Sequence, residues 1–194
     1  LQTTASHFPD ELVESELGMI PKGWEVSSLG QQYNITMGQS PKGESYNEEK
    51  EGTLFFQGRA EFGWRYPTPR LYTTDPKRMA QKGDILMSVR APVGDFNIAL
   101  DDCCIGRGLA SLRHKSGSQT YSFYQLLSLK NELDRYNGEG TVFGSINQTN
   151  LKSIFIVNPE KELISFFIKK MSALDEKIKN NSLETLSLIE LRNS

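Results

Sequence analysis

Cysteine and long apolar stretches are scarce in this chain of 194 residues. Only two cysteines occur, side by side at positions 103 and 104. Adjacent cysteines do not form a disulfide framework, so the sequence indicates a reducing, cytoplasmic setting, and we expect Cys103 and Cys104 to pack as small apolar side chains. No stretch approaches the roughly 20 apolar residues of a membrane span. Leu1 begins no signal-peptide pattern and is not an initiator Met, which suggests a processed or excised chain.

The residue patterns of common active sites are missing as well. The two histidines, His7 and His114, do not accompany a serine or cysteine in the manner of a catalytic nucleophile. The cysteines lack the paired spacing of a zinc site, and neither common phosphate-binding loop motif occurs. An Asn-Pro pair at 158–159 lacks the aromatic partners of an adenine methyltransferase site. The sequence therefore argues against an enzyme and predicts neither a metal site nor a cofactor in this chain.

Glycine and proline are plentiful, with 16 and 8 residues, which favours a loop-rich fold over a plain helical bundle. The length allows one domain of ordinary size, or a smaller domain with an appendage. The charge is unevenly distributed: net −6 over residues 1–51, +4 over 52–115 and zero over 116–194. A basic middle within an acidic chain is typical of local phosphate contact, although an excess of four positive charges is modest.

The basic middle contains two unusual stretches. In QGRAEFGWRYPTPRLYT, residues 57–73, arginines are interleaved with aromatic residues. In GDILMSVRAPVGDFNIA, residues 83–99, apolar residues alternate with a period of two on both sides of a short turn, which predicts two half-buried strands. Arg90 stands at the mouth of that turn, and two interpretations are open for it: a solvated strand end, or a side chain that faces an anionic partner.

The remaining pattern divides the chain into three parts. Residues 1–23 resemble an acidic linker in which the apolar residues form at most a short helical turn. Residues 24–159 contain further short apolar strands near 54–56, 109–112 and 154–157, a helical spacing over 120–135, and a glycine-rich loop in which Asn147 is predicted to cap a short turn. We expect this part to be the globular domain.

Residues 160–194 have a different character, because no glycine or proline occurs from Glu160 to Arg192. A helix of that length spans about 50 Å at 1.5 Å per residue. Apolar residues recur at spacings of three and four, as in a coiled coil; the predicted stripe includes Phe167, Met171, Leu174, Ile178, Asn181, Thr185 and Leu188. The preferred interpretation is a partner helix from another chain or another segment, with Asn181 setting its register. The alternative is a helix that lies back on its own domain.

Several pieces stand in a characteristic order: GMIPKGWEVSSLG (18–30), GQSPKG, LFFQG, KGDILMSVRAPVGDFNIA, IGRGLASL and GTVFGSINQTNLKSIFIVNPE, followed by the long helix. In this order they resemble one half of a DNA-specificity (S) subunit of a Type I restriction–modification system, over residues 8–194. The opening FPDELVESELGMIPKGWEV resembles the linker that leads into the second target-recognition domain of such a subunit.

The resemblance implies a mixed α/β (α+β) target-recognition domain with a twisted sheet and short helices, followed by a spacer helix. Two such halves pair their spacer helices antiparallel, which sets the distance between two half-sites in double-stranded DNA. Methyltransferase (M) subunits assemble around them, bind S-adenosylmethionine and modify adenine, and a separate restriction/motor (R) subunit cuts. None of that chemistry belongs to the specificity subunit.

The resemblance implies a role in DNA binding for the polar residues singled out above. Arginine contacts guanine bidentately, and glutamine or asparagine contacts adenine in the same way. The residues expected to contact bases are Gln57, Arg59, Arg65, Tyr66, Arg70 and Tyr72. The residues expected to orient the domain or hold phosphate are Arg90, Arg107, Thr141 and Asn147.

Two rival functions remain open at this stage. One is a protein-interaction module without a DNA role, which explains the acidic net charge and the helix but not the arginines and aromatic residues of 59–72. The other is a nuclease or methyltransferase, which the missing catalytic groups oppose. The target sequence does not follow from the residues, because base recognition also depends on geometry and DNA shape.

Overall fold

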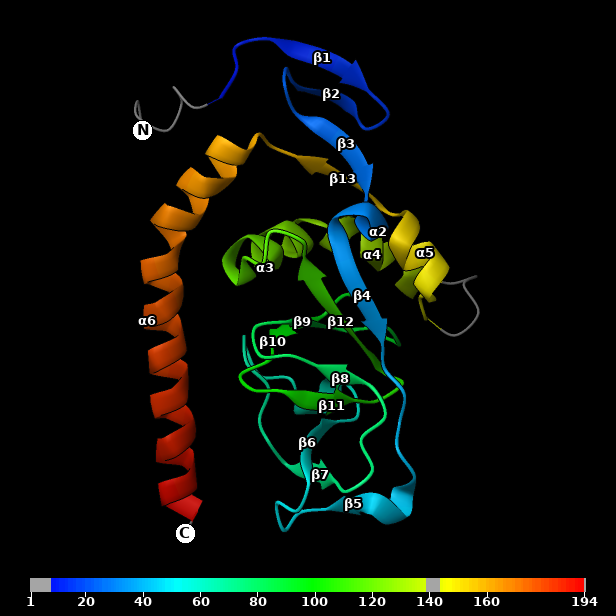
Figure 1. The fold of residues 1–194 in the computed structure, drawn as a ribbon, viewed down its shortest axis with the longest axis vertical. Helices are drawn as coiled ribbons and strands as arrows, with labels where there is room; N and C mark the ends of the chain where they lie inside the picture. The colour runs from blue at the N-terminus through cyan, green and yellow to red at the C-terminus, as the bar shows by residue number, and fades with distance from the viewer. Residues whose placement is uncertain (1–7, 139–143, 194) are drawn as a thin grey trace.

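The computed structural model describes residues 8–138 and 144–193 (Figure 1). These residues form two larger β-sheets, two separate strand pairs, several short helices and one long C-terminal helix. The mixed α/β fold class predicted from the sequence is confirmed.

The first sheet has the strand order β10-β9-β12-β4, with antiparallel neighbours throughout. Its strands are β4 (Tyr33–Met37), β9 (Ile85–Ser88), β10 (Phe96–Ile98) and β12 (Leu109–His114). The predicted hairpin is confirmed, with Met87 opposite Phe96 and Ile85 opposite Ile98 in β9 and β10. The strand predicted near 109–112 is β12.

The second sheet has the order β5-β7-β6-β11-β8. Its strands are β5 (Tyr46–Asn47), β6 (Thr53–Phe56), β7 (Leu71–Thr73), β8 (Met79–Ala80) and β11 (Cys103–Ile105). The pair β6–β11 is parallel, whereas the other pairs are antiparallel. As expected, Cys103 and Cys104 pack in the interior, where both are fully buried.

Strand β9 is buried on both faces, which corrects the expectation of a half-buried strand. Ile85 and Met87 belong to the main core beneath the helices. Leu86, on the other face, packs into a second cluster with Phe56 and Ile105 of the second sheet. Because each face of β9 meets another layer, its alternating pattern does not separate buried from solvated positions.

Short helices cover the main core. They are α2 (Leu29–Gln32), α3 (Gln119–Ser128), α4 (Lys130–Asp134) and α5 (Gln148–Ser153). Single turns occur elsewhere along the chain: η1 (Gly43–Ser45), η2 (Arg59–Glu61) and η3 (Arg135–Asn137). The helix expected over 120–135 is divided at Leu129, whose ψ of 2° leaves the helical region. Asn147 caps α5 as predicted, because its Oδ1 accepts a hydrogen bond of 2.8 Å from Asn150 N.

The N-terminal segment is a β-hairpin, which corrects the expectation of a linker with at most a helical turn. Strands β1 (Leu12–Ser15) and β2 (Gly18–Pro21) pair antiparallel, and Val13 stands opposite Ile20. The hairpin forms because Gly18, with a φ of +90°, supplies the left-handed conformation that the turn requires. Strand β3 (Glu25–Ser28) follows and pairs with β13 (Phe155–Asn158), so that the two ends of the domain meet.

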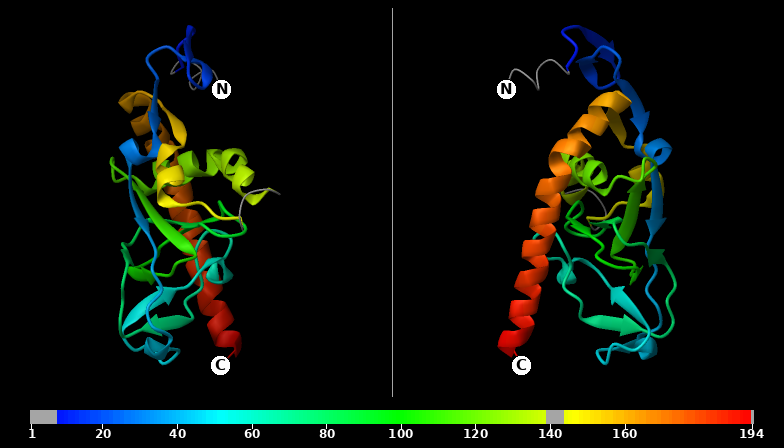
Figure 2. Two further views of the ribbon diagram at one scale, coloured as in Figure 1. Left: turned by 90° about the vertical axis from the view of Figure 1, so that its right-hand side faces the viewer. Right: turned by 60° about the vertical axis from the view of Figure 1, so that its left-hand side comes forward.

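The predicted long helix is confirmed as α6 (Lys161–Asn193). It starts near the N-terminal hairpin and runs along one side of the domain toward the second sheet (Figures 1 and 2). Ile178 packs against the main core and Asp175 is buried, so the face that contains them covers the helix's own domain. The alternative of a helix lying on its own domain is therefore correct for this face. Within residues 8–138 and 144–193, no helix is long and apolar enough to cross a membrane.

Candidate nucleic-acid interface

Four segments from distant parts of the sequence are joined side by side by backbone hydrogen bonds. The amide of Gly106 donates to Phe56 O at 2.8 Å, and the amide of Val89 donates to Gly108 O at 2.9 Å. The amide of Ile146 in turn donates to Val89 O at 3.1 Å. The ends of β6 and β9, the β11–β12 turn and the segment before α5 therefore form one continuous edge of the domain.

This edge carries five of the residues singled out from the sequence, and we call them the polar rim. They are Gln57, Arg59, Arg90, Arg107 and Asn147, and all five are exposed. Three cations and two amide-bearing side chains on neighbouring backbone segments form an arrangement able to bind an extended anion with polar edges.

Glycines allow the segments of the polar rim to approach closely. A Cβ at Gly106 would lie 2.7 Å from Gln57 O, and a Cβ at Gly108 would lie 3.0 Å from the same atom. On the other side, a Cβ at Gly38 would lie 2.1 Å from Gly106 O. Glycine is therefore required at positions 38, 106 and 108, because backbone packs directly on backbone there.

The cations of the polar rim differ in their partners. The side chain of Arg59 is held by Asp95, with Nε 2.5 Å from Oδ2. The side chains of Arg90 and Arg107 make no ion pair with any residue that the structure describes. Arg90 is held by its backbone, which bridges to Ser145. Both guanidinium groups are thus attached to backbone that is fixed, are exposed, and have no carboxylate partner among residues 8–138 and 144–193.

Arg65 and Tyr66 lie away from the polar rim, in the interior, which corrects their expected role at bases. Arg65 is 7% exposed and forms a buried ion pair with Asp175 of α6. Tyr66 is 5% exposed and belongs to the main core, where burial raises the pKa of its hydroxyl. Neither side chain is presented to a ligand, since both are buried and Arg65 is paired with α6.

Arg70 and Tyr72 lie in and beside the second sheet rather than in the polar rim. The guanidinium of Arg70 pairs with Glu61 at 3.1 Å, and Glu61 also accepts a hydrogen bond from the amide of Gly58. Tyr72 of β7 stands opposite Leu54 of β6 and is half-buried. Arg70 is therefore a neighbour of the rim through Glu61, whereas Tyr72 serves mainly in the sheet. Thr141 lies outside the described residues.

One further segment lies at this edge, the GQSPKG loop (38–43), whose residues carry no role expected from the sequence. In the GQSPKG loop, the amide of Gln39 donates to Ile105 O at 2.9 Å. Ser40 Oγ accepts a hydrogen bond of 3.2 Å from the amide of Arg107. Lys42, which follows, has an exposed side chain. The signal was present in the sequence, because a polar loop with a glycine is typical of backbone that approaches another segment closely.

The predicted stripe of α6 divides into two parts. Phe167, Met171 and Ile178 are half-buried against the domain. The side chains that remain exposed lie on one flank of the helix; they are Leu174, Asn181, Thr185 and Leu188. Leu174 is 54% exposed and Leu188 is 59% exposed. Asn181 is exposed within this chain, and the flank offers a partly apolar surface for another helix.

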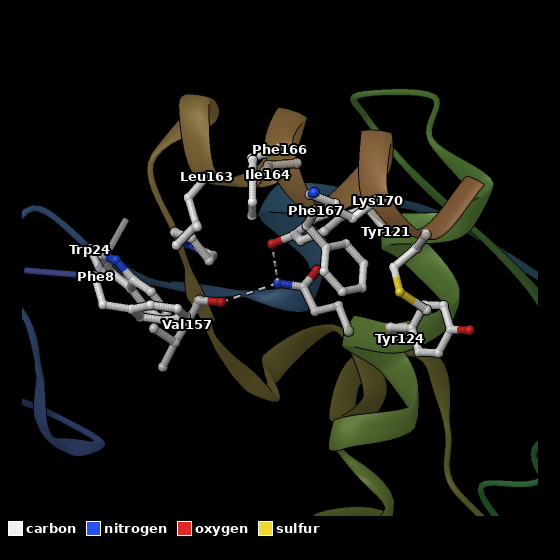
Figure 3. A pocket seen from close by; sticks show the side chains of 13 residues that line it. Phe8, Trp24, Tyr121, Tyr124, Val157, Leu163, Ile164, Phe166, Phe167 and Lys170 are labelled. Carbon is white, nitrogen blue, oxygen red and sulfur yellow. Dashed lines mark hydrogen bonds between the residues drawn. The ribbon is translucent and has the colours of Figure 1, made fainter. Parts of the chain in front are cut away.

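An apolar groove of about 550 Å³ lies where α6 begins (Figure 3). Phe8 and Trp24 line one end, and Tyr124 lines the other. The first turns of α6 contribute Leu163 and Phe167. Lys170 is the one charged residue among the described residues that line the groove, so charged groups do not converge there as catalysis requires, and the groove is better suited to an apolar side chain of a partner than to a reaction.

The chemistry of the described residues offers no metal site and no reactive thiol. No group of three or more His, Cys, Asp or Glu able to hold a metal occurs in 8–138 and 144–193. Burial raises the pKa of the Cys103 thiol to about 12, so it stays protonated at neutral pH.

These features agree with the comparisons with known proteins. The chain belongs to the family described as the Type I restriction modification DNA specificity domain, whose model matches residues 21–190. A putative type I restriction enzyme MjaX specificity subunit from Methanocaldococcus jannaschii is 46% identical over 85% of this chain and 40% of that protein.

Solved structures give the same result. The crystal structure of the HsdS subunit from Thermoanaerobacter tengcongensis is 36% identical, with a TM-score of 0.70, over 92% of this chain and 43% of that one. A chain from a structure of type I R-M complex assembly and conformational transition is also 36% identical, with a TM-score of 0.71, over 97% and 47% of the two chains. The chain therefore spans about half the length of the relatives it matches.

Proposed function

We propose that this chain recognises a short sequence in double-stranded DNA and directs the partner subunits of a Type I restriction–modification complex to it. The observation that carries the proposal is the polar rim, whose five exposed polar side chains lie on neighbouring backbone segments. Duplex DNA presents phosphates and base edges, and guanidinium and amide groups are their usual partners. Membership of the specificity-domain family supports the same function.

Within the rim, we assign base contacts to Gln57 and Arg59. Arg59 then exchanges its pairing with Asp95 for a base edge, because a guanidinium pairs bidentately with guanine. Arg90 and Arg107, which no described carboxylate neutralises, hold phosphates. Asn147 fixes the end of α5 at the rim with its side chain.

The chemical steps belong to other subunits in this proposal. Methyltransferase subunits bind S-adenosylmethionine and modify adenine, and a restriction/motor subunit cuts DNA. This chain contributes recognition and supplies no catalytic group. Because its ligand is DNA, we propose that it acts in the cytoplasm.

We also propose that the exposed flank of α6 packs antiparallel on a second α6, from another copy or from a second half. Leu174 and Leu188 provide apolar contact, and Asn181 between them specifies the register. In an antiparallel pair, the C-terminal end of one helix lies beside the start of the other, where the apolar groove opens.

The test is a selection from random duplex DNA, with the chain alone and again with its methyltransferase subunit. The expected result is an enriched short motif, or two half-sites at a fixed spacing. No enrichment in either condition, from a folded sample, would refute DNA recognition.

The second candidate function is a protein-interaction module that dimerises through α6. The apolar groove and the exposed leucines of the helix favour it. Stable self-association without salt-dependent binding to duplex DNA would identify this function. Activity with a metal ion or S-adenosylmethionine in the absence of any partner would instead indicate an enzyme.

A further inference from the structure

Three side chains from three separate elements join α6 to the domain in a closed set of hydrogen bonds, and we call them the Arg65 cluster. Arg65 Nη1 donates to Asp175 Oδ1 at 2.6 Å, and Nη2 donates to the Tyr124 hydroxyl at 3.1 Å. The Tyr124 hydroxyl donates to Asp175 Oδ1 at 3.0 Å. The cluster therefore connects the η2–β7 segment, α3 and α6.

The cluster is removed from water. Arg65 and Asp175 are 7% and 8% exposed. The guanidinium carbon lies 4.5 Å from the ring centre of Phe123, so an aromatic face covers the charge. Burial lowers the pKa of Arg65, but the hydrogen bonds that Arg65 donates to Tyr124 and Asp175 outweigh this effect, so the pKa of Arg65 lies above its usual value. A buried pair of this kind adds little net stability compared with apolar packing, but it demands one geometry.

The sequence of α6 makes this geometry unique. Asp175 lies on the face of the helix that covers the domain, among Ile168, Met171 and Ile178. A slip of one turn would place Met171 or Ile178, rather than a carboxylate, opposite Arg65. Glu176 is the next residue, but it points about 100° away around the helix and is exposed.

The C-terminal half of α6 packs less closely on the domain than the middle of the helix does. A hollow of about 290 Å³ lies between this half and the second sheet, and Lys179, Leu183 and Leu186 line it on the helix side. Space beside a helix permits small rotations and shifts of its side chains. The Arg65 cluster is thus the directional contact between the domain and the middle of the helix.

We propose that Arg65, Tyr124 and Asp175 are positioning residues that fix the domain on its helix and thereby define the distance between the two half-sites. The inference rests on the proposed DNA recognition. A slip of one helical turn moves α6 by about 5.4 Å, which exceeds the rise of about 3.4 Å per base pair. A small change in docking therefore changes the spacing of the target without touching the residues that contact bases.

The test compares Asp175→Asn with Glu176→Gln, which makes the same chemical change on the exposed face of the helix. Tyr124→Phe, which removes only the hydroxyl, is a second and milder variant of the cluster. Each chain is assembled with its methyltransferase subunit, and its affinity is measured for the selected target with the spacer at its original length and changed by one base pair in either direction.

We expect wild type and Glu176→Gln to discriminate against a changed spacer by about tenfold or more, as for a mismatched base pair. Asp175→Asn and Tyr124→Phe should discriminate against the changed spacer by less than about threefold. The base preference within each half-site should stay unchanged. Equal discrimination in all four proteins would overturn the positioning role, and so would a uniform loss of affinity at every spacing. If wild type itself selects no motif, the failure lies in the proposed DNA recognition, and the positioning role falls with it.

Discussion

Two arginines of the basic middle show how strongly surroundings determine the role of a residue. Arg65 is buried beneath Phe123 and paired with Asp175. Arg90 is exposed at the end of β9, where its backbone is fixed by a bridge to Ser145 and its side chain is paired with no described residue. The first joins two elements of the fold, whereas the second is available to a phosphate.

The role of Arg90 can be tested with Arg90→Ala. We expect weaker binding to all duplexes alike, because a phosphate contact carries no sequence information. The slope of log affinity against log salt concentration should fall in magnitude by about 0.9 for one lost contact. The comparison is Lys169→Ala, an exposed lysine on α6, which should leave the slope unchanged. An Arg90→Ala protein with wild-type affinity and slope would argue for a solvated strand end.

His114 provides a prediction about pH. Burial lowers the pKa of this side chain, and the charge of Lys115 lowers it further. The unfolded chain, with a pKa of about 6.5, therefore binds a proton before the folded chain does. The free energy of unfolding should fall as pH decreases through about 6.5 toward the lower folded pKa.

The measurement is urea unfolding at several pH values for wild type and His114→Gln. Glutamine does not titrate, so the variant should lose less stability between about pH 7.5 and 5.5. The difference between the two slopes isolates His114 from the carboxylates. Parallel slopes would mean that burial of this imidazole does not favour its neutral form.

At the scale of elements, the glycines of the β11–β12 turn determine how the polar rim is assembled. Gly106→Ala would place a Cβ 2.7 Å from Gln57 O, a backbone atom that cannot rotate away. We expect a loss of about 1–3 kcal/mol in the free energy of unfolding, as for other overpacked sites. The displaced Gln57 should also weaken base preference in a duplex selection.

The matched substitution is Gly58→Ala in the same region. A Cβ at Gly58 meets nothing within 4 Å, and its φ of −170° is extended backbone that alanine adopts. This variant should unfold at the same urea concentration as wild type. If both variants behave alike, the close approach at Gly106 does not explain why glycine stands there.

The elements that could be predicted from sequence are those whose signal is local. Alternation identified β9 and β10, the absence of glycine and proline identified α6, and Asn147 marked the start of α5. The N-terminal hairpin was missed because its apolar residues are few and its acidic residues suggested a linker. The burial of Arg65 could not be predicted, because its partner lies 110 residues away on another element.

The candidate site could be predicted only in part, because residue types are a local signal whereas the arrangement of the segments is not. The residue types predict a nucleic-acid surface, but composition does not show which arginines point inward. Only the backbone hydrogen bonds between the four segments bring Gln57, Arg90 and Arg107 to one edge. Those bonds depend on the packing of the two sheets, which no short pattern in the sequence specifies.

At the scale of the whole molecule, α6 has one face on its own domain and an exposed apolar flank. Leu174→Lys should weaken pairing with a second helix, because burial of a leucine is worth about 1.5–3 kcal/mol. This corresponds to at least about a tenfold higher dissociation constant, measured by sedimentation over a range of concentrations. The thermal midpoint of the domain should stay unchanged.

The control for this variant is Ala173→Lys, which adds the same charge about 100° around the helix from Leu174. Ala173 is exposed, so the lysine is tolerated. We expect this protein to associate like wild type. Equal weakening by both lysines would indicate a general effect of charge, and no effect of either would place the partner helix elsewhere.

Strand β3 lies against β13, so the chain enters and leaves the domain at one point, with Glu25 opposite Asn158. A module whose ends meet can be exchanged between genes without disturbing the segments that flank it. Arg65 limits this freedom, because it pairs with Asp175 outside the exchanged segment. Exchange of the segment between β3 and β13 can therefore replace the residues of the polar rim, since none of them contacts α6 through the Arg65 cluster. An incoming domain must still supply a cation where Arg65 stands, or the inherited helix receives a carboxylate without a partner.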